Sequence, residues 1–274
     1  MSLTSYAQDL ESLYHRYNRR GYVHPDPLEL VLLYDDPADQ EVVALIASTL
    51  AYGRVSQILR SVALALQPMG LHPSRYLRGA TVDRIRRDYL GFYHRFSTGE
   101  QLAALLAGVK RVMRLYGSLR EFFVSALFES DPNILPALES FVSGLAVAAG
   151  EPVGHLLPCP AKGSACKRMN LFLRWMVRRD EVDPGGWDEV PAAKLLIPLD
   201  THMHRICLVL GATRRRAADM RAAVEVTEAF RKIAPEDPVK YDFVLTRLAI
   251  RPDVCPAGAF CQPEEVMGHV ALPG

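Results

Sequence analysis

Apolar residues recur every three or four positions along most of this chain, which is the spacing of amphipathic helices. Alternating apolar and polar runs bounded by turn residues are scarce, so we expect no substantial sheet. The pattern therefore predicts an all-α fold. The expected helices span residues 6–17, 41–51, 55–66, 99–115, 118–127, 134–147, 169–178, 201–210, 219–233 and 239–250.

Turn-forming residues separate several of these helices. Residues 150–165 are rich in Pro, Gly and small side chains, and residues 180–191 contain the turn sequence Asp-Pro-Gly-Gly. Asp237 followed by Pro238 predicts the start of the last helix, because Asp is a favoured N-cap and Pro is tolerated at the first helical position.

The composition permits a large buried core and gives little hint of a partner. Of 274 residues, 49% are hydrophobic, and the net charge is +1. The charge is unevenly distributed, however. Residues 21–53 contain six acids and no Lys or Arg, whereas residues 160–179 contain six bases and no acid. We therefore expect any anionic partner to contact the second segment.

The cysteine content and the absence of long apolar runs point to a cytoplasmic protein. The five cysteines are an odd and sparse set, which favours a reducing compartment. The first 21 residues are polar and charged, so we expect no signal peptide. No apolar run reaches about 18 residues, so we expect no membrane span.

Lys167 follows a loop of small residues and is expected near the first turn of the next helix. The positive end of the helix dipole and the nearby cations Lys162 and Arg168 disfavour a second positive charge there. A neutral lysine amine is the form that attacks C1′ of a deoxyribose and forms a Schiff base. Three residues follow Lys167 at helical spacing and are expected on its face: Asn170, Arg174 and Arg178.

Two other interpretations of this segment stay open. Lys167 can be an exposed lysine beside a solvated arginine stripe, since runs of charge usually face water. Alternatively, the loop can bind a phosphate through backbone N–H groups at the helix N-terminus.

Asp200 lies in a second segment, residues 197–202 (Ile-Pro-Leu-Asp-Thr-His), at the expected N-cap of a helix. Capping alone explains an Asp here, since a cap contributes about 1 kcal/mol. A carboxylate that accepts helix N–H bonds also favours its charged form and can stabilise a developing oxocarbenium ion. His202 and His204 are two positions apart and do not face the same way, so we expect no metal site.

In this order, the two segments resemble the Lys-then-Asp catalytic pair of helix-hairpin-helix DNA glycosylases of the endonuclease-III-like group. Residues 167–173 (Lys-Arg-Met-Asn-Leu-Phe-Leu) resemble the start of the second hairpin helix, where Asn follows the catalytic Lys by three residues. Residues 198–202, followed by Arg205, resemble the Val-Asp-Thr-His…Arg segment. Residues 41–54 resemble the early buried helix that ends at a DNA-facing loop. Within this superfamily, the chain is most similar to a bacterial family of unknown function.

The resemblance implies a two-lobed, all-α fold with a central helical barrel lobe. Residues 1–40 and 185–274 would form a terminal lobe carrying Asp200, and residues 41–184 an inserted lobe carrying Lys167. It also implies a base-excision repair glycosylase with lyase activity. The partner would be double-stranded DNA with a damaged base, so we expect a cytoplasmic protein associated with the nucleoid. The sequence sets no oligomeric state.

The resemblance also implies roles for residues around the catalytic pair. Tyr52, Trp175, Trp187 and His202 would line the pocket for the flipped base, with Tyr52 as a wedge or stacking residue, although a core role is favoured for Trp175. The expected contacts to DNA phosphates are Arg54, Lys162, Gly163, Ser164, Arg168, Arg174 and Arg178.

Three features depart from the family pattern. The hairpin usually reads Leu-Pro-Gly-Val-Gly, whereas residues 157–165 form a longer loop with a single glycine. Lys167 and Asp200 are 33 residues apart, an unusually long gap shared with archaeal 8-oxoguanine glycosylases, which favours an oxidised purine as substrate. An iron–sulfur cluster needs four cysteines, and only Cys255 and Cys261 lie near the C-terminus, so we expect no cofactor.

Two alternative functions follow from the same residues. A non-catalytic relative of this fold would bind DNA with a steep salt dependence and cleave no lesion. A helical protein-interaction module would bind no DNA even at low salt, and the near-zero net charge agrees with this alternative.

Overall fold

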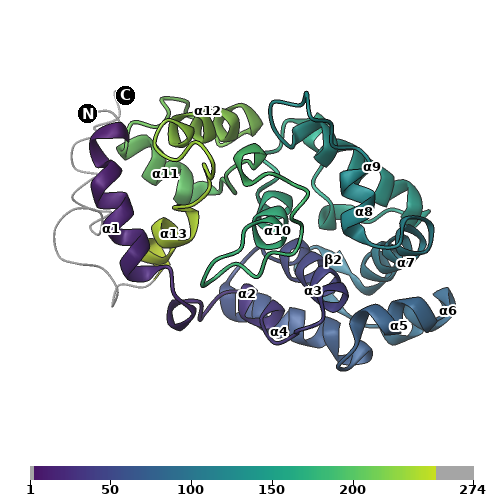
Figure 1. The fold of residues 1–274 in the computed structure, drawn as a ribbon. Coiled ribbons are helices and arrows are strands. Elements are labelled where there is room, and N and C mark those ends of the chain that lie inside the picture. The colour runs from purple at the N-terminus through teal and green to yellow at the C-terminus, as the bar shows by residue number, and fades with distance from the viewer. Residues whose placement is uncertain (1–2, 251–274) are drawn as a thin grey trace, which may run out of the picture.

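The structure is a computed structural model that describes residues 3–250, apart from the side chains of Lys162 and residues 248–250. Helices make up 61% of it and strands 3%, which confirms the predicted all-α class (Figure 1). No helix in the described range is long and apolar enough to cross a membrane.

The first third of the chain is a series of short helices joined by tight turns. These are 3₁₀ helix η1 (Leu3–Tyr6), α1 (Ala7–Tyr17), η2 (Arg20–Tyr22), α2 (Leu28–Val31), α3 (Pro37–Thr49), α4 (Val55–Leu66), η3 (Gln67–Met69), α5 (Pro73–Gly79) and α6 (Val82–Asp88). Helix α3 begins where Asp36 caps the N–H groups of Ala38 and Asp39 and Pro37 occupies the first position. Most residues of this helix are buried, including all of residues 41–49.

A small hairpin interrupts the helices. Strands β1 (Tyr93–His94) and β2 (Ser97–Thr98) pair antiparallel, with His94 opposite Ser97. Thr98 then caps the longest helix in a reciprocal capping box with Gln101. The elements that follow are α7 (Gly99–Tyr116), α8 (Leu119–Val124) and α9 (Leu135–Ala149).

The remaining elements carry both sequence segments of interest. They are η4 (Gly154–Leu156), η5 (Pro160–Lys162), α10 (Lys167–Val177), η6 (Ala192–Lys194), α11 (Thr201–Val209), α12 (Met220–Arg231) and α13 (Asp242–Ile250). Lys167 opens α10 and Asp200 immediately precedes α11, as the sequence predicts.

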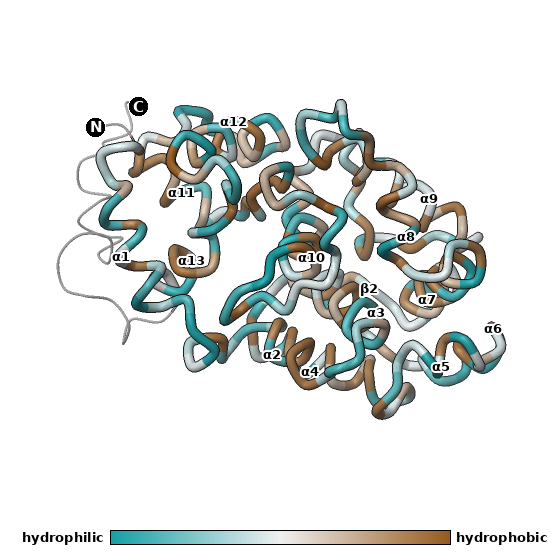
Figure 2. Tube along the Cα trace, viewed as in Figure 1, coloured by the Kyte–Doolittle hydropathy of each residue, from teal (hydrophilic) through white to brown (hydrophobic). Residues whose placement is uncertain are grey.

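The helices gather in two groups on either side of α10 (Figure 1). Helices α1, α11, α12 and α13 lie together at the end of the molecule that holds both termini of the described chain. Helices α3 to α9 lie on the other side, where α3 packs against α10 and α7 against α9. The buried apolar residues of both groups form one continuous cluster. Hydrophobic and hydrophilic positions alternate along most helices, as expected for amphipathic elements (Figure 2).

The observed boundaries correct two expectations. The hairpin and the short helices α5 and α6 were not predicted, because each is too short to show a helical or strand period. The last helix begins at Asp242 rather than at Val239, and Asp237 does not cap it. Instead, the Asp237 carboxylate accepts hydrogen bonds from Nε of Arg178, so an ion pair takes the place of the predicted cap.

Candidate functional site

Lys167 is the first residue of α10, and hydrogen bonds hold the loop that precedes it. The preceding residue, Cys166, has φ +47°, in the left-handed region that non-glycine residues rarely adopt. Its N–H donates to the Ser164 hydroxyl over 3.2 Å. The side chain of the fully buried Asn170 donates back to the Ala165 carbonyl over 3.0 Å. The loop therefore fixes where the Lys167 side chain leaves the helix.

Asp200 is placed with similar definition at the N-cap of α11. Its backbone is extended (φ −108°, ψ −175°), and its carboxylate accepts the N–H of Met203 over 2.9 Å. The chain before it is anchored, because the Ile197 N–H donates to the Thr227 hydroxyl of α12 over 3.0 Å. Leu199 is buried beside it.

The two segments meet at these residues. Nζ of Lys167 lies 3.5 Å from Oδ2 of Asp200, and each side chain is 31% exposed. The pair thus joins the starts of two helices and stays open to solvent. An amine and a carboxylate in this arrangement are within reach of one reacting atom, the amine as a nucleophile and the carboxylate as a stabiliser of positive charge.

The arginines of α10 do not share this surface. Arg174 is 4% exposed and binds Asp183 over 2.9 Å and Asp242 over 2.5 Å. Arg178 binds Asp183, Asp180 over 2.9 Å and Asp237 over 2.9 Å. The prediction that Arg174 and Arg178 contact DNA phosphates is therefore wrong, because both guanidinium groups are buried and neutralised within the protein.

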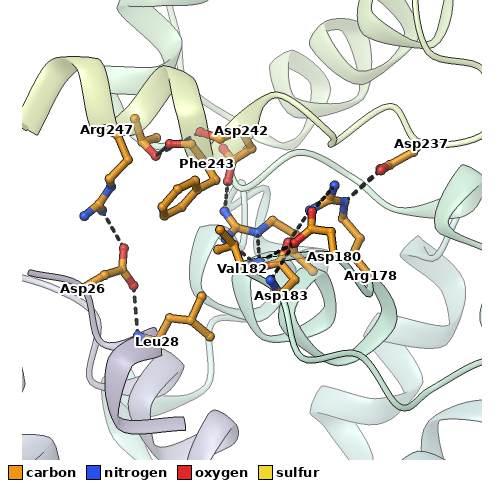
Figure 3. Close-up of polar contacts among 12 residues, drawn as sticks. Asp26, Leu28, Arg178, Asp180, Val182, Asp183, Asp237, Asp242, Phe243 and Arg247 are labelled. Atoms are coloured by element: carbon orange, nitrogen blue, oxygen red, sulfur yellow. Dashed lines mark hydrogen bonds and ion pairs between the residues drawn. The ribbon is translucent and has the colours of Figure 1, made fainter. Parts of the chain in front are cut away.

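Figure 3 shows these ion pairs as a network between helices. Burial opposes charge on Arg174 and Arg178, but the surrounding carboxylates prevail and raise the pKa of both guanidinium groups. Burial raises the pKa of the Asp242 carboxyl despite its bond to Arg174. A second pair, Arg247 with Asp26, ties α13 to the turn before α2 over 2.6 Å. The network therefore fixes α10 against α13 and the segments around them.

The other predicted phosphate contacts divide into supporting and exposed residues. Arg168 donates to the carbonyls of Thr49, over 2.5 Å, and His155, and its guanidinium lies 4.9 Å from the Tyr52 ring centre. Arg168 thus supports the loop after α3, and its bonds to carbonyls within the protein leave the prediction of a phosphate contact without support. The exposed residues are Arg54, Gly163 and Ser164. The side chain of Lys162 lies outside the described atoms.

The predicted pocket residues are not assembled as expected. Trp175 and Trp187 are both buried, and the Trp187 indole N–H donates to the Glu41 carboxylate over 2.9 Å. The core role favoured for Trp175 agrees with this burial, and the assignment of Trp187 to a base pocket is not supported, because both rings are packed in the core. Tyr52 is half-buried and His202 is exposed at the start of α11. A cavity of about 80 Å³ lies among α6, α7 and α9, and neither Lys167 nor Asp200 lines it.

The structure adds basic residues that the sequence analysis overlooked. A short bridge pairs Ser164 of the loop before α10 with Asp219, the N-cap of α12, and the Met220 N–H donates to the Gly163 carbonyl over 3.2 Å. This contact brings the segment before α12 alongside the loop. Three exposed arginines lie on or beside that segment: Arg214, Arg216 and Arg221. The run of three arginines at 214–216 is a signal that could have revealed the first two.

Within the described part of the chain, no group of three or more His, Cys, Asp or Glu side chains is arranged to hold a metal ion. Cys255 and Cys261 lie outside the described residues, so the expectation about an iron–sulfur cluster stays a prediction. Cys159, Cys166 and Cys207 are free thiols.

Comparison with known proteins places the whole site within one family. The family described as Protein of unknown function (DUF2400) matches residues 26–251, a span that includes the hairpin, Lys167, Asp200 and the buried network. This chain belongs to the DUF2400 family. No curated protein and no solved structure matches it.

Proposed function

We propose that this DUF2400 protein is a DNA glycosylase with lyase activity, built on the two-lobed helix-hairpin-helix glycosylase fold. The observation that supports the proposal is the pairing of Lys167 and Asp200 at 3.5 Å, each at the start of its own helix and each partly exposed. The two groups come from segments 33 residues apart in the sequence. The grouping of helices on either side of α10 agrees with two lobes.

The first step is departure of the damaged base. The bond between the base nitrogen and C1′ breaks, the base takes the electron pair and a proton, and positive charge develops on the sugar. Asp200 supplies a negative charge at a fixed position for this cation. Because its carboxylate is held by the Met203 N–H, little reorganisation is needed when the charge forms.

The second step is attack by Lys167. Its amine forms a bond to C1′ and loses a proton, and opening of the sugar ring gives a Schiff base. Removal of a C2′ proton then expels the 3′ phosphate and cuts the strand. The electrons and protons balance with the amine, the sugar and water alone.

Exposed arginines of two loops supply contacts to the DNA backbone in this proposal. Arg54 follows α3, while Arg214, Arg216 and Arg221 lie beside the loop that precedes α10. These side chains replace the buried arginines of α10 in the proposed interface. Phosphate contacts of this kind position DNA and make its binding sensitive to salt. An oxidised purine is the first substrate to test, because the 33-residue gap between Lys167 and Asp200 resembles that of archaeal 8-oxoguanine glycosylases.

Borohydride trapping tests the proposal. Wild-type protein is incubated with duplexes that contain an abasic site or 8-oxoguanine, beside Lys167→Ala and a control, Lys232→Ala, which removes an exposed lysine after α12. We expect a covalent adduct with wild type and the control and none with Lys167→Ala. An adduct that persists in Lys167→Ala would assign the nucleophile elsewhere, and the absence of DNA binding at low salt would overturn the proposed function.

A further inference from the structure

The β1–β2 hairpin presents aromatic rings to solvent. Arg95 and Phe96 form its two-residue turn. Phe96 is 62% exposed and Tyr93 is 66% exposed. Two exposed aromatic rings on one short element give a surface on which a partner can stack.

The turn is held in an unfavourable backbone conformation. Arg95 has φ +53° at a position where such hairpins prefer glycine. Among the described residues, Arg95 and Cys166 are the two non-glycine residues with positive φ, and Cys166 immediately precedes Lys167. Backbone strain of this kind is concentrated at functional sites. An arginine at a position that favours glycine points to a use for its side chain.

The base of the hairpin is rigid. The Tyr52 hydroxyl lies 3.0 Å from the His94 carbonyl and 2.8 Å from the Ser97 hydroxyl, so it links both strands. The buried His94 ring lies 2.9 Å from the Ser61 hydroxyl, and burial lowers the pKa of the imidazole. Tyr52 is therefore committed to supporting the hairpin rather than free to insert into DNA.

The surroundings of the turn are basic. The Arg95 guanidinium lies 5.5 Å from the Phe96 ring centre, and its side chain passes over Gly53. Arg54 is exposed in the same α3–α4 loop. No Asp or Glu occurs at residues 42–82 or 89–99, the segments that form this loop and the hairpin. The charge therefore favours an anionic partner.

The hairpin is also connected to the candidate site. Phe96 lies 5.7 Å from the His155 ring, and the carbonyl of His155 accepts a bond from Arg168. Arg168 directly follows Lys167 and stacks on Tyr52. These contacts join the hairpin to the start of α10, where Lys167 lies.

We propose that the hairpin tip stacks on an unpaired nucleobase of the DNA strand, with Phe96 as the principal platform and Arg95 contacting the adjacent phosphate. This inference rests on the proposed DNA-related function and deepens it. Exposed aromatic rings interleaved with arginines are suited to unstacked nucleic acid, because every base has a π-face and every nucleotide carries a phosphate. A purely apolar protein partner would leave Arg95 without a complementary charge.

Binding to a duplex with a tetrahydrofuran abasic analogue tests the inference apart from the chemistry, because this sugar cannot form a Schiff base. A 2-aminopurine placed opposite the analogue reports stacking, and anisotropy reports affinity. The variants are Phe96→Ala and a matched control, Phe128→Ala. Phe128 is 63% exposed and lies between α8 and α9.

We expect Phe96→Ala to weaken binding about 10- to 100-fold and to abolish the 2-aminopurine response, while Phe128→Ala binds as wild type. Arg95→Gly relieves the positive φ, so it should fold at least as well as wild type and still bind less tightly. Equal binding by Phe96→Ala and Phe128→Ala would overturn the inference. The inference would also be overturned if Phe96→Ala changed the oligomeric state of the protein and left its DNA affinity unchanged.

The outcomes separate this inference from the proposed function. If Phe96→Ala binds DNA and forms the covalent adduct as well as wild type does, the hairpin has no role in DNA binding, and the proposed glycosylase function still stands. Binding that depends on Phe96 without any trapped adduct would support the hairpin's role in a DNA-binding protein that lacks the chemistry.

Discussion

The two ends of helix α10 carry the same kind of residue and use it in opposite ways. At its start, Lys167 faces one carboxylate, that of Asp200, at 3.5 Å, and both side chains remain about one-third exposed. Toward its end, Arg174 and Arg178 face several carboxylates at shorter distances and are almost completely buried. A loosely held, accessible pair can react, whereas a buried and fully paired cation can only hold the structure together.

The number of partners, rather than the charge itself, distinguishes these regions. Asp183 alone accepts from both arginines, while Asp200 meets a single amine and a backbone N–H. The helical spacing predicts all three cations on one face. Arg174 and Arg178 are instead paired with acids of the loop that follows α10, Asp180 and Asp183, and with Asp237 and Asp242 from farther along the chain. A basic stripe in a sequence is therefore no measure of basic surface.

The largest expected difference between the two ends of α10 is in how much each ion pair contributes to stability. Asp183→Ala removes a carboxylate shared by two buried guanidinium groups, and we expect it to lower the free energy of unfolding by about 3–5 kcal/mol. Lys167→Ala should change it by less than about 0.5 kcal/mol, because partly exposed ion pairs contribute little. Urea unfolding monitored by circular dichroism measures both. Similar losses in the two variants would remove the distinction between the ends of α10.

The second prediction concerns the role of Asp200 in activity, and Asp219 provides a matched control. Asp200 and Asp219 are both N-caps with nearly the same geometry, and their side chains are 31% and 33% exposed. Asn caps helices nearly as well as Asp, so both Asn variants should fold. We expect Asp200→Asn to slow adduct formation by about 10²–10³-fold, the usual effect of removing one electrostatic stabiliser. Asp219→Asn should retain its rate, and equal losses would reduce Asp200 to a cap.

A third prediction separates Lys167 from its neighbour as the nucleophile. Burial raises the pKa of the Cys166 thiol from 9.0 to about 11. Near neutral pH, its reactive thiolate is therefore about 100-fold scarcer than in an ordinary thiol. Alkylation at Cys166 should rise tenfold per pH unit up to about pH 11. Peptide mapping after iodoacetamide treatment measures this rate, with the half-buried Cys159 as reference. Rapid labelling of Cys166 near neutral pH would make its thiolate a competing nucleophile.

The smallest effect is expected in the loop before α10. Gly163 has φ +77°, and a Cβ added there would meet no atom within 4 Å. Gly163→Ala should therefore cost only about 1 kcal/mol of stability, through backbone strain alone. If the loop contacts a phosphate, DNA affinity should also fall. The melting temperature and a salt titration of binding measure the two effects, and unchanged affinity would remove the loop from the interface.

Local features of the fold could be predicted from the sequence. The bounds of α4 match the prediction. The place of Lys167 at the start of its helix and the N-cap role of Asp200 also follow from neighbouring residues. Such features depend on interactions within a few positions, which periodicity and capping rules describe. The expected division into lobes at residues 40 and 184 stays a prediction.

The errors arose where distant residues decide the outcome. Arg174 finds Asp242 at a sequence separation of 68 residues, and Trp187 finds Glu41 at 146 residues. Neither partner can be identified from spacing, so the sequence predicts a phosphate contact for Arg174 and a pocket position for Trp187. The hairpin was missed for the opposite reason, because four paired residues are too few to show alternation.

The bridge between Asp26 and Arg247 has a consequence for how the site comes into being. It joins residues 221 positions apart, and contacts of such separation form late because a long loop must close first. Helix α13, which this bridge anchors, packs on α11 and binds α10 through Asp242. The spacing of Lys167 and Asp200 is therefore a property of the assembled fold. A fragment spanning residues 160–205 would contain both side chains and lack the geometry, so the chemistry is not portable to another scaffold as a short motif.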